Sequence, residues 1–183
     1  RDGAELIEVE NALLRRLGYR FVDPQLLVSA LTHRSAGGVN NERLEFLGDA
    51  VLGLVIAEAL YKRYPEASEG ELSRLRASLV RKQTLAELAR DLELGDCLRL
   101  GSGELKSGGY RRDSILADAL EAIFGAVYLD AGFAASASLI QALYAERLQT
   151  LPVEPLAIKD PKTQLQEYLQ GRRLSLPEYE VIS

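Results

Sequence analysis

The chain has 183 residues and a formal net charge of −5, from 27 acidic and 22 basic side chains. Its hydrophobic content of 47% permits a substantial core. The chain has no uncharged apolar run of about 18 residues, so no membrane-spanning helix is expected. One cysteine excludes an internal disulfide and is typical of a reducing, cytoplasmic compartment. The acidic balance does not by itself indicate a nucleic-acid binder, which is expected to carry a basic excess or stripe.

The N-terminal part of the chain predicts two helices. Residues 5–17 have apolar positions at helical spacing, and Gly18 follows as a stop. Asp23 followed by Pro24 predicts the start of the next helix, because proline is favoured in the first helical turn. Residues 36–40 are then predicted to form a loop.

An acidic stripe marks the start of the helix that is predicted next. Glu42, Glu45 and Asp49 are spaced by three and four residues, which places them within an arc of roughly 60° on a helix. Residues 51–57 are apolar on every side, which predicts a buried helix. A proline must end this helix by about Tyr64.

The middle of the chain predicts one or two helices over residues 71–92 and a glycine-rich loop over residues 100–109. The loop has neither the spacing of a phosphate-binding P-loop nor that of a dinucleotide fingerprint. Basic side chains in these segments either contact RNA phosphates or form a solvated face, and the sequence leaves both readings open. They are Arg74, Arg76, Arg81, Lys82, Lys106, Arg111 and Arg112.

A second strongly apolar helix is predicted to begin at an N-cap of Asp113 or Ser114 and to end at Gly132. Only Asp118 and Glu121 interrupt its apolar character up to residue 129, and their spacing of three places them on one face.

The two apolar helices therefore carry one carboxylate pair each, Glu45 with Asp49 and Asp118 with Glu121. Like charges in a poorly solvated place are unfavourable unless they are protonated or neutralised. If the helices cross, four carboxylates converge, and such an oxygen-only site suits Mg²⁺ or Mn²⁺ better than zinc. The alternative is that these carboxylates lie on a solvated helix face. The presence of two such pairs, each inside an apolar helix, disfavours it. A di-iron bundle is excluded because it needs two Glu-x-x-His motifs and the chain has one histidine.

Three further residues bear on this prediction. Gly48 and Gly53 lie inside the first apolar helix, where each is expected to cost about 1 kcal/mol relative to alanine. A close helix crossing would explain both. His33 is expected to make a local hydrogen bond and is left out of the catalytic set.

The run Asn41-Glu-Arg-Leu-Glu-Phe-Leu-Gly-Asp49 resembles the signature of bacterial ribonuclease III. The segments around it agree in type and order: Leu31-Thr-His-Arg-Ser35, Glu69-Gly-Glu-Leu-Ser-Arg-Leu-Arg-Ala77 and Asp113-Ser-Ile-Leu-Ala-Asp-Ala-Leu-Glu-Ala122. The resemblance covers essentially the whole chain. It implies an all-α endonuclease domain over residues 1–150, followed by a linker over 151–160.

The resemblance also implies that residues 161–183 are the N-terminal part of a truncated α/β double-stranded-RNA-binding domain. A helix and a strand are predicted there. One polar face of that helix is similar to the face that reaches 2′-hydroxyls in an RNA minor groove. Its residues are Thr163, Gln166, Glu167 and Gln170.

The function implied by the resemblance is hydrolysis of phosphodiester bonds in double-stranded RNA, leaving 5′-phosphates and short 3′ overhangs, in the processing of ribosomal and messenger RNA. Mg²⁺ is the implied cofactor, with Mn²⁺ as a substitute. The implied assembly is a symmetric homodimer that binds double-stranded RNA, with no membrane or small-molecule partner.

Residue roles carry over from the resemblance by position. The metal ligands are matched by Glu45, Asp49, Asp118 and Glu121, of which Asp49 and Glu121 are expected to be catalytic. Glu42 and Glu69 match acidic residues near the cleavage site and the subunit interface. Phe46 matches an aromatic residue that inserts into the partner subunit.

Two other classes of protein stand as alternatives. One is a non-catalytic double-stranded-RNA-binding protein on the same fold, which the presence of all four matched ligands disfavours. The other is a helical metal-binding protein with no RNA role, which would leave the signature and the C-terminal polar face unexplained.

Overall fold

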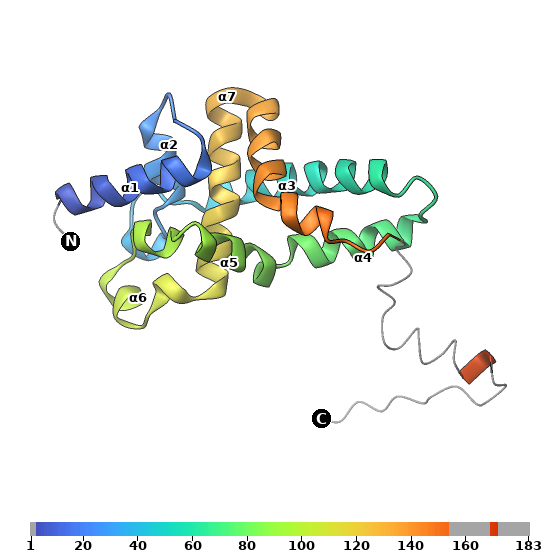
Figure 1. Ribbon diagram of the computed structural model, residues 1–183. Coiled ribbons are helices and arrows are strands. Elements are labelled where there is room, and N and C mark those ends of the chain that lie inside the picture. The colour runs from blue at the N-terminus through green and yellow to red at the C-terminus, as the bar shows by residue number, and fades with distance from the viewer. Residues whose placement is uncertain (1–2, 154–168, 172–183) are drawn as a thin grey trace.

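The computed structural model describes residues 3–153 and 169–171, and every regular element in that part of the chain is a helix. The predicted all-α fold is therefore confirmed for the catalytic region. The molecule is elongated, and the long helix α7 crosses the other helices near the middle of the molecule (Figure 1). The α-helices are α1 (Gly3–Leu17), α2 (Pro24–Ala30), α3 (Glu42–Arg63), α4 (Glu69–Val80), α5 (Lys82–Asp91), α6 (Ser102–Lys106) and α7 (Asp113–Gln149), with 3₁₀ turns η1 (Arg34–Ala36), η2 (Leu94–Cys97) and η3 (Gly109–Arg111).

The end of α1 and the start of α2 lie where the sequence predicts, whereas α1 begins at Gly3, two residues before its predicted start. Gly18 follows the last residue of α1 with a φ of +63°, a conformation that glycine adopts without strain. Asp23 caps α2 by accepting a hydrogen bond from the Gln25 amide at 2.9 Å. Asp130 of α7 accepts hydrogen bonds from the amides of Val22 and Asp23, each at 2.9 Å, which ties the connection between α1 and α2 to the central helix.

Helix α7 consists of two antiparallel segments that are joined at Gly132. This glycine has a φ of 84° and a ψ of 179°, so it ends the first segment as the sequence predicts. The chain rises through the middle of the molecule and turns back at the top (Figure 1). The Ser136 hydroxyl of the second segment donates to the Phe124 carbonyl of the first at 2.9 Å, which fastens the two together.

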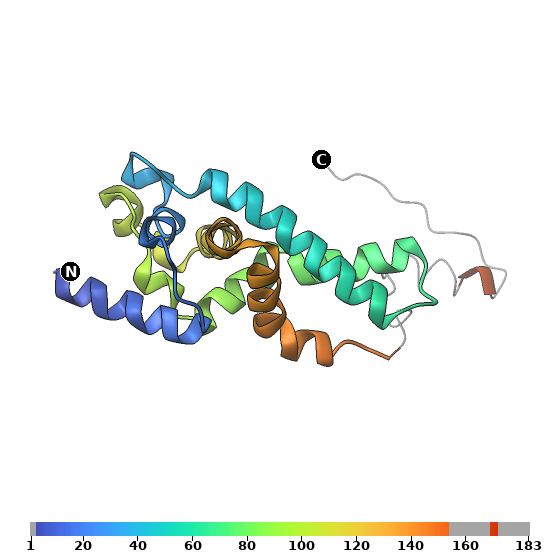
Figure 2. The same ribbon diagram turned by 90° about the horizontal axis from the view of Figure 1, so that it is seen from above.

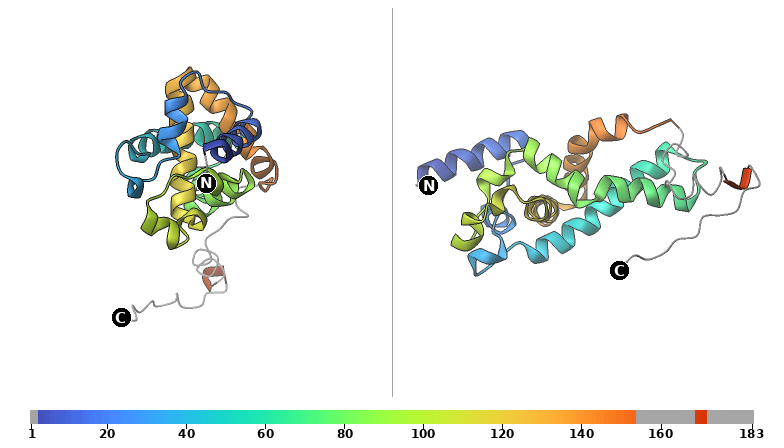
Figure 3. Two further views of the ribbon diagram at one scale, coloured as in Figure 1. Left: turned by 90° about the vertical axis from the view of Figure 1, so that its left-hand side faces the viewer. Right: turned by 90° about the horizontal axis from the view of Figure 1, so that it is seen from below.

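The first segment of α7 forms the centre of the core. Leu120 and Phe124 are fully buried, and α7 packs against α2, α3 and α5. Figure 3 shows this segment end-on, with other helices around it. Burial of a large apolar side chain contributes about 1.5–3 kcal/mol, so this column accounts for much of the stability. By length and composition alone α7 is also apolar enough to cross a membrane, as core helices can be.

Helices α3 and α7 cross so closely that a side chain does not fit at two positions. A Cβ on Gly48 would lie 1.7 Å from the Glu121 carbonyl oxygen, and one on Gly125 would lie 2.3 Å from the Leu44 carbonyl oxygen. The crossing predicted from Gly48 is confirmed. The same prediction is wrong for Gly53, where a Cβ would meet nothing within 4 Å, so no close helix contact lies over this glycine. Beyond its crossing with α7, helix α3 runs beside α4 (Figure 2).

The prediction that α3 is buried on every side over residues 51–57 is wrong at Leu54, whereas Val51, Leu52, Val55 and Ile56 are buried as predicted. Phe46 is 81% exposed, and Leu54 and Tyr61 are exposed with it. The reason is that α7 and α4 cover only part of the circumference of α3, so an apolar face is left open in the single chain.

Two local predictions need correction. The glycine-rich segment 100–109 contains the short helix α6, which is anchored where the Ser35 hydroxyl accepts a hydrogen bond from the Gly101 amide at 2.9 Å. Neither Asp113 nor Ser114 caps α7, because its N-cap is Arg112 and Asp113 is its first helical residue. Asp113 instead forms an ion pair with Arg90 of α5.

The segment after α7 is described only in part. The predicted linker starts along the end of α3, where Arg63 donates to the Leu151 carbonyl at 3.1 Å and the Tyr64 hydroxyl donates to the Pro152 carbonyl at 2.5 Å. Gln170 is exposed in a helical turn over residues 169–171. The other three residues predicted to contact RNA, namely Thr163, Gln166 and Glu167, lie outside the described residues. The boundaries of the linker and of the RNA-binding fragment stay predictions.

Candidate metal centre

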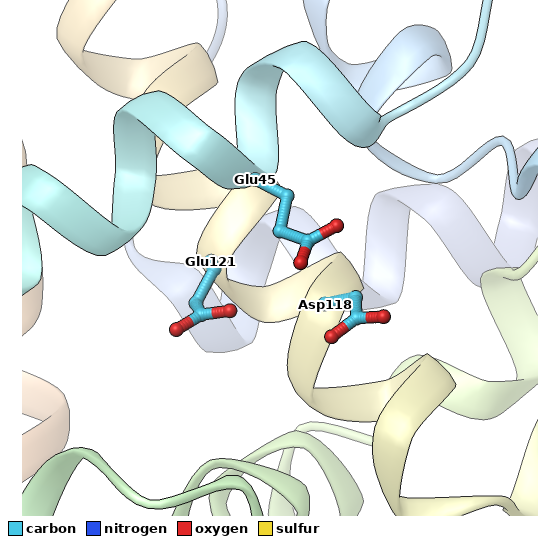
Figure 4. Close-up of side chains that lie close together, drawn as sticks. All are labelled: Glu45, Asp118 and Glu121. Atoms are coloured by element: carbon cyan, nitrogen blue, oxygen red, sulfur yellow. The ribbon is translucent and has the colours of Figure 1, made fainter.

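Three carboxylates meet where α3 crosses α7. Glu45 comes from α3, and Asp118 and Glu121 come from the first segment of α7 (Figure 4). One carboxylate oxygen from each of the three lies within 4.8 Å of the others. The structure therefore brings together three of the four ligands predicted from the sequence, and we refer to Glu45, Asp118 and Glu121 as the carboxylate cluster.

The close helix crossing explains why these side chains meet. Gly48 lies one turn after Glu45, and its missing side chain lets the backbone of α3 reach that of α7 at Glu121. Asp118 is one turn before Glu121 on the same face of α7. Two short-range spacings and one glycine thus fix the geometry of the carboxylate cluster.

Glu121 is the most buried member of the cluster, with 7% of its surface exposed. Burial, followed by the negative charges of Asp49, Glu45 and Asp118, raises the pKa of Glu121 to about 8. The pKa of Glu45 is also raised, first by burial and then by Asp118. A cation among these oxygens would reverse both effects, since it favours the ionised carboxylates.

Lys82, the first residue of α5, provides a positive charge at the cluster. Its Nζ donates to Asp118 Oδ1 at 2.8 Å. The sequence left open whether Lys82 contacts a phosphate or lies on a solvated face, and the structure places its ammonium beside Asp118. No spacing rule could have found it, because the two residues are 36 positions apart.

The other acidic residues predicted for the site lie in different places. Asp49 is exposed and outside the group of three, although its charge acts on both Glu45 and Glu121. Glu42 lines a cleft beside the cluster and forms an ion pair with Arg34 at 3.5 Å. Their roles remain predictions.

The cleft next to the carboxylate cluster has a volume of about 600 Å³. Arg34 and Arg112 stand on its walls, and Arg112 pairs with Glu104 at 2.8 Å. The cleft therefore presents acidic oxygens with cationic groups close by. Its lining comprises His33, Arg34, Ser35, Asn41, Glu42, Glu45, Glu104, Arg112, Ser114, Ile115 and Asp118.

Sequence reasoning gave no role to several of these lining residues, among them Arg34 and Asn41. Both residues belong to sequence runs that carry the family resemblance, and this was the feature of the sequence that could have indicated a role for them. Asn41 is buried and its side-chain amide donates to the Ala30 carbonyl at 3.3 Å, which holds the start of α3 against α2. His33 makes the local contact that the sequence predicts, since its Nδ1 lies 2.8 Å from the Ser35 hydroxyl.

Glu69 lies away from the cleft, on a second feature of the surface. It belongs to an apolar groove of about 360 Å³ between α3 and α4, and it accepts a hydrogen bond from the Ser73 hydroxyl at 2.6 Å. The exposed Phe46 is on the same helix as one wall of this groove. The groove is lined by Leu54, Ala57, Glu58, Leu60, Tyr61, Glu69, Leu72, Ser73 and Arg76.

The donor set of the cluster fits a hard divalent cation. All three side chains offer carboxylate oxygens. The single histidine of the chain, His33, also lines the cleft, where its Nδ1 contacts the Ser35 hydroxyl of its own turn. Glu121 is a buried carboxylate whose raised pKa signals negative charge that the protein alone does not fully offset. The carboxylate cluster can therefore hold a divalent metal at the edge of an open cleft.

Comparison with known proteins agrees with this arrangement. Residues 23–148 match the family model described as ribonuclease-III-like. The chain is 64% identical over 170 residues to ribonuclease 3 of Nitrosococcus oceani, covering 92% of this chain and 73% of that protein. It is 62% identical over 171 residues to ribonuclease 3 of Hahella chejuensis, covering 93% and 75%.

Solved structures point the same way. The nuclease domain of ribonuclease III from Campylobacter jejuni superposes with a TM-score of 0.74 at 44% identity, covering 78% of this chain and 97% of that one. A second structure of that domain, whose description concerns flexibility in a region involved in dimer formation, gives a TM-score of 0.72 at 46% identity, covering 74% and 95%. With a matching family model, relatives above 60% identity and the same helical fold, this chain belongs to the ribonuclease III family.

Proposed function

We propose that the carboxylate cluster, with Asp49 beside it, binds Mg²⁺ and is the active site at which this protein cleaves RNA. The protein is an endoribonuclease of the ribonuclease III family, and its substrate is double-stranded RNA. The observation that carries the site assignment is the meeting of three carboxylates within 4.8 Å at the edge of an open cleft. Mn²⁺ has similar ligand preferences and is expected to substitute.

Glu45, Asp118 and Glu121 would hold a divalent cation there, which would supply a Lewis acid able to activate water and to offset charge on the phosphate. The chain contributes the rest. Glu121 holds a proton at neutral pH before the cation binds, because burial raises its pKa to about 8. Arg34 and Arg112 place positive charge on the cleft walls, where the phosphates of a bound strand would pass. Hydrolysis at this site is expected to leave 5′-phosphates and short 3′ overhangs.

The apolar groove and Phe46 support a symmetric homodimer. An exposed phenylalanine on the same helix as one wall of an apolar groove provides the knob and the recess that a self-complementary two-fold interface needs. The description of the Campylobacter jejuni nuclease domain also refers to dimer formation. In this dimer Glu69 would lie at the subunit interface, and one duplex would span both clefts. We expect Gln170 and its predicted helix to add contacts to RNA 2′-hydroxyls.

The cellular role follows from the substrate. A double-strand-specific endoribonuclease acts on the paired regions of ribosomal and messenger RNA precursors, and we place this activity in the cytoplasm. The single cysteine of the chain, Cys97, is buried, which is compatible with a reducing compartment.

The deciding experiment is cleavage of a perfect RNA duplex at low salt with Mg²⁺, with Ca²⁺ or with a chelator, by wild type and Glu121→Gln. We expect cutting with Mg²⁺ only. Glu121→Gln should lower the rate by more than about a hundredfold, since loss of a supporting residue around a metal already costs up to that much. Glu146→Gln, an exposed change in the second segment of α7, is the matched control.

Undiminished cleavage by Glu121→Gln would rule out this site. A folded wild type that retains the duplex without cutting it under any condition would favour the non-catalytic double-stranded-RNA binder.

A further inference from the structure

We propose that Lys82 is a built-in counter-cation of the carboxylate cluster, which holds Asp118 while no metal is bound and which the divalent cation must displace. The inference rests on the proposed metal site and concerns what sets its affinity. It assigns to Lys82 a role other than a contact to RNA or a solvated charge.

The position of Lys82 is set by the fold. Helix α4 ends at Val80, and the extended Arg81 turns the chain directly into α5. Helix α5 packs against α7, which brings its first residue to the acidic face of that helix. The Lys82 Nζ then reaches Asp118 Oδ1 at 2.8 Å, a charge-assisted hydrogen bond of ordinary length.

The ammonium acts on the whole cluster as well as on its direct partner. The charge of Lys82 lowers the pKa of both Glu45 and Glu121, against the effects of burial and of the neighbouring carboxylates. In return, the hydrogen bond with Asp118 raises the pKa of Lys82, so the side chain is cationic at neutral pH. Within the described residues, Lys82 is therefore a cation whose charge favours the ionised forms of both Glu45 and Glu121.

Displacement by a metal is chemically direct. A hard cation and an ammonium compete for carboxylate oxygens, and two positive charges a few ångströms apart repel each other. Asp118 is largely enclosed, whereas the Lys82 side chain is 60% exposed and can turn into solvent without disturbing the core. Lys82 is therefore suited to leave when a cation arrives.

The test is a thermodynamic cycle on the full chain, with Mg²⁺ itself as the ligand. Calorimetry gives the dissociation constant and thermal unfolding gives the Tm across an MgCl₂ series, with KCl keeping the ionic strength constant. For Lys82→Gln we expect Mg²⁺ to bind about fivefold more tightly, at the upper end of what a partly exposed ion pair contributes. The Tm of the metal-free variant should fall by about 2 °C, and this deficit should vanish at saturating Mg²⁺.

Two further variants complete the design. Lys82→Arg retains the charge and should stay close to wild type in both measurements. Lys62→Gln removes a matched ion pair, since Lys62 is also exposed and donates to Glu58 at 2.6 Å on α3, outside the cluster and the cleft. It should leave the affinity for Mg²⁺ unchanged.

Each contrary result has a distinct meaning. Unchanged or weaker Mg²⁺ binding by Lys82→Gln would overturn the inference, as would a Tm deficit that persists at every Mg²⁺ concentration, because the ion pair would then be structural only. A wild type that binds no divalent cation would overturn the proposed function together with this inference.

Discussion

Helix α3 has two faces that differ in how the rest of the chain covers them. One face carries Glu45 and Gly48 against α7, where acidic side chains are held at a close backbone contact. The other carries Phe46, Leu54 and Tyr61, apolar side chains that the described chain leaves exposed. On these two faces the acidic Glu45 is partly enclosed and three apolar side chains are open, the reverse of an ordinary surface helix. The core-facing apolar residues of α3 are buried as usual, namely Leu44, Val51, Leu52, Val55, Ile56 and Leu60.

This reversal indicates where the single chain lacks a binding partner. Carboxylates that are enclosed call for a cation, and apolar side chains that are exposed call for a covering surface. The two faces of α3 therefore correspond to the two proposed additions, a metal ion on one side and a second copy of the chain on the other. Separate substitutions can test each face without changing the other.

The largest effect is expected where α3 and α7 touch. Gly48→Ala should destabilise the protein by at least about 4 kcal/mol, because its Cβ would overlap the Glu121 carbonyl and force the helices apart. The carboxylate cluster would be lost with the crossing. Urea unfolding measures the change, and Gly53→Ala on the same helix is the control.

Gly53→Ala should be neutral or stabilising by up to about 1 kcal/mol, since its Cβ meets nothing within 4 Å. Equal stability of the two variants would contradict the close crossing.

The next effect concerns pH and the enclosed carboxylates. The pKa of Glu121 in the fold is about 8, above its ordinary value of 4.5, so the folded state binds the proton that the unfolded state releases. Its stabilising contribution is complete below pH 4.5 and is lost as pH rises through 8. Relative to Glu121→Gln, the metal-free wild type should lose on the order of 4 kcal/mol between pH 5 and pH 9.

Parallel unfolding curves for wild type and Glu121→Gln over pH 5 to 9 are the measurement. Saturating Mg²⁺ should restore stability to the wild type at high pH and not to the variant. A difference between the two proteins that does not change with pH would show that Glu121 is ionised throughout.

The smallest effect concerns the open face. Phe46→Ala should weaken self-association by roughly tenfold, since burial of this side chain in a partner contributes about 1.5 kcal/mol or more. Sedimentation equilibrium measures the association, and Val22→Ala, an equally exposed apolar change in the connection before α2, is the control. An unchanged association constant would place the subunit interface on another face.

The sequence predicted local structure well wherever a short-range signal existed. The ends of α1 and α2 followed from Gly18 and from the capping residue Asp23, and the break in α7 followed from Gly132. It failed at the glycine-rich segment, where α6 is held by a contact from Ser35, and at the start of α7, where Asp113 pairs with Arg90. In both cases a residue distant in sequence supplies the deciding interaction.

For the site, the chain alone determined which helices carry carboxylates and that Gly48 permits a close approach, because both are consequences of helical period and side-chain size. The tertiary structure decided which carboxylates meet. It placed Glu45, Asp118 and Glu121 together, left Asp49 outside that group and brought Lys82 to Asp118. These contacts depend on the angle and distance at which helices cross and on packing between segments that are far apart in sequence. Neither is encoded in a local sequence pattern.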